Sequence, residues 1–102
     1  MALKIITKKR YQNNLKKIVS YLVTNWSKEV AENFLDLLFT KYELLSITPN
    51  IGLQVSSAKN VRSILITKHN KVYYRVEKGY LIIINVIDAR RNPKKNPFNK
   101  SK

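Results

Sequence analysis

Positively charged side chains recur between positions 62 and 91 at spacings that could bind phosphate groups. Lys71, Tyr73 and Arg75 alternate onto one face of an expected strand. Arg62 lies on the expected strand before it, and two further arginines follow the last strand at positions 90–91. Cations from separated segments that meet at one end of a rigid sheet would bind phosphate or stabilise a developing oxyanion. A solvated polar face on a half-exposed sheet explains the same pattern equally well.

Three further side chains could contact a nucleic acid or another target. Lys68 and His69 lie in the turn between two expected strands. Tyr73 could stack on a base, although aromatic residues in strands more often pack across strands. For His69, a plain turn residue is favoured over a phosphate contact. The candidate target-binding residues are therefore Arg62, Lys68, His69, Lys71, Tyr73, Arg75, Arg90 and Arg91.

The sequence offers no metal site and no cofactor motif. It contains no cysteine and one histidine, His69, and the acidic residues are not clustered around that histidine. Two glycines far apart in the chain do not make a phosphate-binding loop. Lys68 and Lys71 flank His69, which disfavours a Ser–His–Asp arrangement. We therefore expect no metal and no small-molecule cofactor, and a binding protein is favoured over an enzyme.

The charge of the chain points to a polyanionic partner. The 102 residues include 20 Lys and Arg against 6 Asp and Glu, which gives a formal net charge of +14. Between Lys59 and Lys102, 12 basic residues stand against 2 acidic ones. Such a field favours nucleic acid, an anionic membrane surface or an acidic protein. The sequence shows no signal peptide and no apolar run long enough to span a membrane, so we expect a cytoplasmic protein without a membrane partner.

The spacing of apolar residues predicts one α+β domain over residues 1–102. We expect an N-terminal strand over 2–6, helices over 8–25 and 28–46, an irregular segment over 53–60, strands over 61–66, 71–76 and 80–87, and a basic tail over 89–102. The short break between the helices predicts an antiparallel helical hairpin. The three late strands predict an antiparallel meander, with all strands in one sheet.

Three details of the helical hairpin can be predicted. Ser27 is a good N-cap for the second helix. Trp26, beside it, is expected to plug the hairpin. The apolar face of the second helix is expected to comprise Val30, Ala31, Phe34, Leu37, Leu38 and Leu45.

This order of elements resembles the RelE/ParE superfamily of bacterial type II toxin–antitoxin toxins. Residues 26–34 (WSKEVAENF) are similar to the start of the second helix in ParE-like members. Residues 44–52 (LLSITPNIG) resemble their helix exit, L-x-x-x-P-x-x-G. Residues 61–64, 71–76 and 87–95 resemble the strand signatures. The resemblance covers nearly the whole chain.

The resemblance implies two possible activities. RelE-like toxins are ribosome-dependent mRNA endonucleases that use basic residues on the sheet, and Arg62, Lys71, Arg90 or Arg91 fall near those positions. One of the basic nuclease positions is Ile64 here, and no His or Tyr follows Ile87. Cleavage gains from a proton acceptor and a proton donor, so these departures favour the ParE-like branch, which poisons DNA gyrase. A non-toxic basic nucleic-acid-binding module is a third possibility.

The resemblance also implies a protein partner. Both branches are neutralised by an antitoxin that wraps the toxin with a segment that folds on binding. The charge of +14 suits an acidic antitoxin, because opposite fields speed and orient association.

Overall fold

A computed structural model describes residues 2–56 and 59–88 of the chain. The elements are β1 (Lys4–Thr7), α1 (Lys9–Asn25), α2 (Lys28–Ile47), the short 3-10 helix η1 (Pro49–Ile51), β2 (Leu53–Ser56), β3 (Val61–Thr67), β4 (Asn70–Glu77) and β5 (Tyr80–Asp88). They form the α+β fold expected from the sequence. The basic tail predicted over 89–102 lies outside the described residues.

The ends of α2 follow from local chemistry. Ser27 is the N-cap, and its Oγ accepts a hydrogen bond from Val30 N at 3.1 Å, as predicted. Glu29 lies in the first turn, where its charge suits the helix dipole. At the other end, Thr48 N donates to Leu44 O at 2.8 Å, and Pro49 then starts η1. α2 therefore ends at Ile47, because a proline at position 49 disfavours helical geometry at Thr48.

The strands form one five-stranded sheet in the order β1-β5-β4-β3-β2. The meander β3-β4-β5 is antiparallel, as predicted. The sheet as a whole is mixed, because β1 pairs with β5 in parallel. The prediction of an irregular segment over 53–60 is wrong at its start, because β2 pairs with β3 over Leu53–Ser56. The alternation of β2 is too polar and too short to predict a strand.

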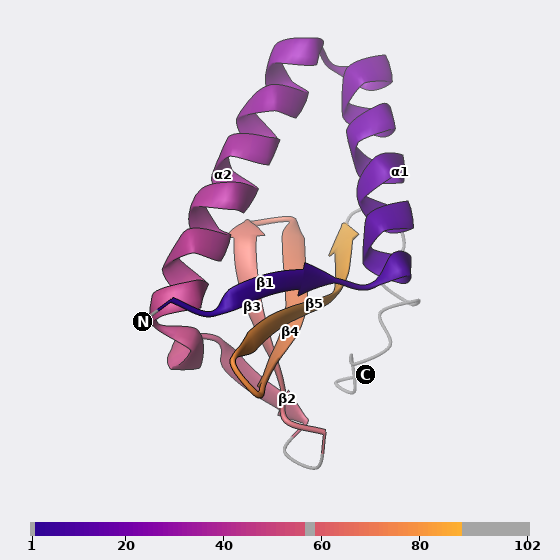
Figure 1. Cartoon of the computed structure of the whole chain (residues 1–102). Coiled ribbons are helices and arrows are strands. Elements are labelled where there is room, and N and C mark those ends of the chain that lie inside the picture. Colours follow the sequence, from indigo (N-terminus) through magenta and orange to yellow (C-terminus); the bar gives the residue numbers. More distant parts are fainter. Residues whose placement is uncertain (1, 57–58, 89–102) are drawn as a thin grey trace.

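The two helices cover one face of the sheet and diverge from their connection toward it (Figure 1). The core between these layers is closed by side chains with no exposed surface, among them Leu38 of α2, Tyr74 of β4 and Ile83 of β5. Inside it, Tyr42 Oη donates to Tyr11 Oη at 2.8 Å. The core therefore joins both helices to the middle of the sheet.

Three predicted core positions are wrong. Val30 and Leu37 of α2 are 38% and 51% exposed, whereas Ala31 and Phe34 are buried as predicted. The buried face of α2 is therefore narrower than the apolar pattern suggests. Trp26 is 62% exposed and does not plug the hairpin. Trp26 is the C-cap of α1, in the short connection that leads to α2.

Within residues 2–56 and 59–88, no helix combines the length and the apolar character that a membrane span requires.

Candidate functional site

The strand register separates the cations that the sequence suggested might meet. Arg62 lies directly opposite Tyr74, and directly opposite residues share a face of the sheet. Tyr74 belongs to the core under the helices, so Arg62 points to the helix-covered face. Lys71 and Arg75 lie an odd number of residues from Tyr74 along β4 and therefore face the opposite side. The structure does not bring Arg62 together with Lys71 and Arg75.

Arg62 instead holds the connection between α2 and β2. Its Nη1 donates to Gly52 O at 2.8 Å and to Asn50 O at 3.3 Å. Tyr74 Oη accepts from Gly52 N at 3.0 Å and donates to Pro49 O at 2.6 Å. Burial raises the pKa of Tyr74, although the Gly52 N–H and the Arg62 charge act in the other direction. The hydrogen bonds of the Arg62 and Tyr74 side chains with the backbone of residues 49–52 are called the 49–52 anchor below.

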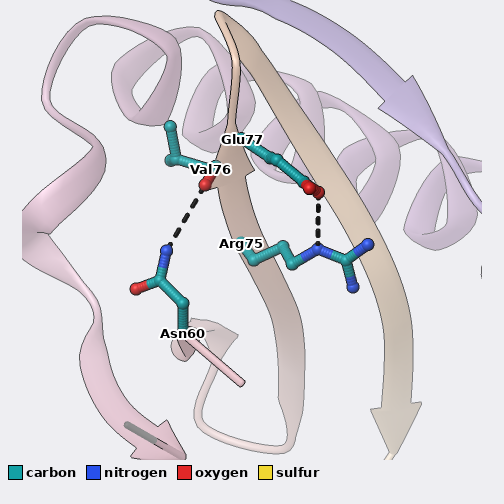
Figure 2. Close-up of polar contacts among 4 residues, drawn as sticks. All are labelled: Asn60, Arg75, Val76 and Glu77. Carbon is teal, nitrogen blue, oxygen red and sulfur yellow. Dashed lines mark hydrogen bonds and ion pairs between the residues drawn. The ribbon is translucent and has the colours of Figure 1, made fainter. Parts of the chain in front are cut away.

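Arg75 is paired with an acid on its own strand. Its Nε lies 3.3 Å from Glu77 Oε1, and the Arg75 side chain is 33% exposed (Figure 2). Beside this pair, Asn60 Nδ2 donates to Val76 O at 3.3 Å. These residues and Lys59 line a shallow hollow of about 260 Å³. An exposed ion pair of this kind is weak, so a phosphate or carboxylate could compete with Glu77 for Arg75.

Two further candidates, Lys68 and His69, lie in the turn between β3 and β4. Thr67 Oγ1 accepts from the backbone N–H groups of His69 and Asn70, each at 3.1 Å, and shapes the turn. Lys68 is exposed. His69 lines a hollow of about 400 Å³ whose other walls are mainly apolar. The residues that line it are Leu22, Trp26, Val30, Asn33, Phe34, Leu37, Thr67, His69 and Asn70.

The remaining predicted residues are not accessible or not described. Tyr73 is 1% exposed, so a base could stack on it only after its surroundings moved. Arg90 and Arg91 lie outside the described residues. Among residues 2–56 and 59–88, no three His, Asp or Glu side chains are grouped closely enough to hold a metal ion.

Sequence reasoning missed two contacts near the predicted cations. Glu77 follows Arg75 by two residues, a spacing that puts both on one face of a strand, so this pair was within reach of the sequence. The contact of Tyr74 with Gly52 spans 22 residues and leaves no local signal.

The fold has close counterparts among solved structures. The chain superimposes on the chromosomal ParDE system of P. aeruginosa with a TM-score of 0.71 at 13% identity, covering 85% of this chain and 96% of that one. A mutant of the E. coli toxin RelE in the free state gives 0.60 at 19% identity, with 91% and 90% covered. The conserved hypothetical protein HP0894 of Helicobacter pylori gives 0.56 at 22% identity, with 86% and 96% covered. No curated protein sequence matches.

The fold is therefore the one shared by these ParE and RelE structures. A family model described as the ParE toxin of the type II toxin–antitoxin system parDE matches residues 5–93. The chain belongs to this ParE toxin family.

Proposed function

We propose that the chain is a toxin that inhibits an essential bacterial process by binding, with DNA gyrase as its target, and that an acidic antitoxin neutralises it in the cytoplasm. Membership of the ParE toxin family supports the toxin role. The separation of Arg62 from Lys71 supports binding over cleavage, because these two of the four cations in the nuclease interpretation face opposite sides of the sheet. Arg62 is, in addition, occupied by the carbonyl groups of the 49–52 anchor.

The target can be tested by inducing the protein in bacteria and following both gyrase and mRNA. We expect the purified protein to inhibit supercoiling by gyrase, and we expect induced cells to accumulate DNA breaks. Transcript mapping of the same cells is expected to show no cuts in phase with codons. Codon-phased cuts with unaffected gyrase would instead establish the ribosome-dependent endonuclease, whose chemistry needs a proton acceptor and donor. Normal growth after induction would favour the non-toxic nucleic-acid-binding module.

The antitoxin can be tested through the charge of the interface. We expect the product of the neighbouring reading frame to bind this chain, and to bind it less tightly as salt is raised from about 0.05 to about 0.5 M, because salt screens exposed charges. The basis is the net charge of +14. Isothermal titration calorimetry at several salt concentrations measures the effect. An affinity independent of salt would mean that the charge does not contribute to this interface.

A further inference from the structure

The part of the helical hairpin around its connection is acidic, although the chain as a whole carries +14. Residues 18–40, called the hairpin tip here, contain three acids and one base. The acids are Glu29, Glu32 and Asp36, and the base is Lys28. The three carboxylates are exposed, and none pairs with a cation in the part of the chain that the structure describes. The connection between α1 and α2 lies at the opposite end of the molecule from β2 (Figure 1).

The hairpin tip also exposes large apolar side chains. Trp26 is 62% exposed, Leu37 51% and Val30 38%. All three line the hollow of about 400 Å³ that His69 borders. Exposed apolar patches on a monomer mark interaction sites, and tryptophan is among the residues that contribute most to protein interfaces. The hairpin tip is therefore a candidate surface for binding another protein.

The hollow also has a buried polar group without a partner. Asn70 forms part of its wall and is 4% exposed. The Asn70 Oδ1 atom accepts a hydrogen bond from Thr67 Oγ1 at 2.7 Å, whereas Nδ2 has no acceptor among the described residues. Buried donors are seldom left unpaired in native proteins. A partner group with an oxygen acceptor, inserted into the hollow, would satisfy this donor.

The acids border the hollow on its α2 side. Asn33 lines the hollow, and Glu29 and Asp36 lie four residues before it and three residues after it on α2. Side chains at these spacings are neighbours on one side of a helix. The β3–β4 turn, with Lys68 and His69, contributes the opposite wall. A basic group of a partner is therefore favoured at the α2 side of the hollow.

We propose that the hairpin tip binds the target enzyme through a basic segment of that enzyme with an apolar anchor residue. The inference rests on the function proposed above and names the surface that contacts the target. The anchor enters the hollow beside Trp26 and Leu37. Lysine or arginine side chains next to the anchor pair with Glu29 and Asp36.

Charge explains why a basic toxin needs such a surface. An enzyme that holds DNA neutralises phosphates with lysine and arginine, so its DNA-binding region is itself basic. A protein of net charge +14 is repelled by such a region unless the face that it presents is neutral or acidic. An acidic antitoxin has the opposite preference and is favoured at the basic faces of the molecule.

The apolar part of the surface is tested with two leucines of nearly equal exposure. Leu37 of α2 is 51% exposed and Leu65 of β3 is 53% exposed, and each is replaced by serine. Binding to purified gyrase is measured by surface plasmon resonance, with inhibition of supercoiling measured in parallel. We expect Leu37→Ser to weaken binding by about tenfold and Leu65→Ser by about twofold or less. Equal effects of the two substitutions would overturn the inference.

The acidic part is tested by reversing one charge at a time. Asp36→Lys changes an acid beside the hollow, and Glu43→Lys makes the same change at an exposed position two turns further along α2. We expect Asp36→Lys to weaken gyrase binding by about tenfold and Glu43→Lys by about threefold or less. The product of the neighbouring reading frame is expected to bind Asp36→Lys at least as tightly as it binds the parent.

The outcomes separate this inference from the proposed function. Equal gyrase binding by Asp36→Lys and the parent would overturn the inference while the toxin proposal stood. An equal loss of gyrase and of the neighbouring product in Asp36→Lys would do the same, because the surface would then not distinguish a basic partner from an acidic one. Failure of the parent itself to bind and inhibit gyrase would overturn both.

Discussion

Replacing Gly52 with alanine is expected to lower the free energy of unfolding by about 3 kcal/mol. A Cβ at this position would meet the Tyr74 hydroxyl, and it would lie 2.7 Å from Ser63 O and 2.9 Å from Tyr74 Cε1. The backbone of Gly52 is not strained, since its φ is −74°. The cost therefore comes from displacing Tyr74, which breaks the hydrogen bonds of the 49–52 anchor. Urea unfolding followed by circular dichroism measures it.

Gly79 provides the matched control for Gly52. It has a φ of +86° and no atom within 4 Å of an added Cβ, so Gly79→Ala tests backbone strain without crowding. We expect this substitution to cost about 1 kcal/mol, the usual penalty for a side chain in the left-handed region. A cost for Gly52→Ala no larger than that of Gly79→Ala would contradict the crowding explanation.

A double-mutant cycle can identify Tyr74 as the group that Gly52 protects. Tyr74→Phe removes the hydroxyl and leaves Pro49 O and Gly52 N without their partner, at a cost of about 1–2 kcal/mol. Gly52→Ala should cost less in that variant than in the parent, by about 1 kcal/mol, because the nearest atom is gone. Additive costs would show that the alanine is rejected by Ser63 O and by the ring carbon that phenylalanine keeps, and not by the hydroxyl.

The 49–52 anchor also affects what the toxicity of an Arg62 variant can show. Arg62→Ala removes the side chain that holds Asn50 O and Gly52 O, so it loosens the segment that leads into β2. Loss of toxicity in this variant would therefore not by itself place Arg62 at a target. Arg75, whose partner Glu77 is 52% exposed, is a cleaner position for testing a contact with phosphate.

The elements that local patterns define were predicted well. The periodicity predicted that the first helix begins at residue 8, and α1 begins at Lys9. It predicted that the second helix ends at residue 46, and α2 ends at Ile47. The hairpin signals also predicted the β3-β4-β5 meander. Cap residues and apolar periodicity act within a few residues of the chain, so they can be read without the rest of the fold.

The features that long-range contacts define could not be predicted. β2 is a strand because β3 lies beside it, and the parallel position of β1 depends on β5, more than 70 residues away. The contacts of the candidate site also depend on residues that are distant in the sequence. Arg62 could be recognised as a cation on a strand, but its partners at residues 50 and 52 depend on how η1 returns to the sheet. Residue types thus indicated candidates, whereas the register decided which of them meet.

Raising the pH above 10 is expected to destabilise the fold through its buried tyrosines. Burial raises the pKa of Tyr42 well above its usual value near 10, and the neighbouring Tyr11 adds to the rise. Burial also raises the pKa of Tyr11, although its hydrogen bond with Tyr42 acts in the opposite direction. Below pH 10 the folded and unfolded chains are protonated alike. Above pH 10 the unfolded chain loses these protons first, so stability falls by up to about 1.4 kcal/mol per pH unit for each tyrosine.

Tyr42→Phe separates this effect from ordinary loss of packing. At pH 8 it should cost about 1 kcal/mol, because Tyr11 Oη loses the hydrogen bond that Tyr42 donates. Between pH 10 and pH 11, however, stability should fall less steeply in this variant than in the parent, since one ionisable group is gone. Ile83→Val, at a position with no exposed surface, should cost a similar amount at pH 8 and keep the parent's slope. Equal slopes for Tyr42→Phe and the parent in urea unfolding would show that Tyr42 does not hold its proton in the folded core.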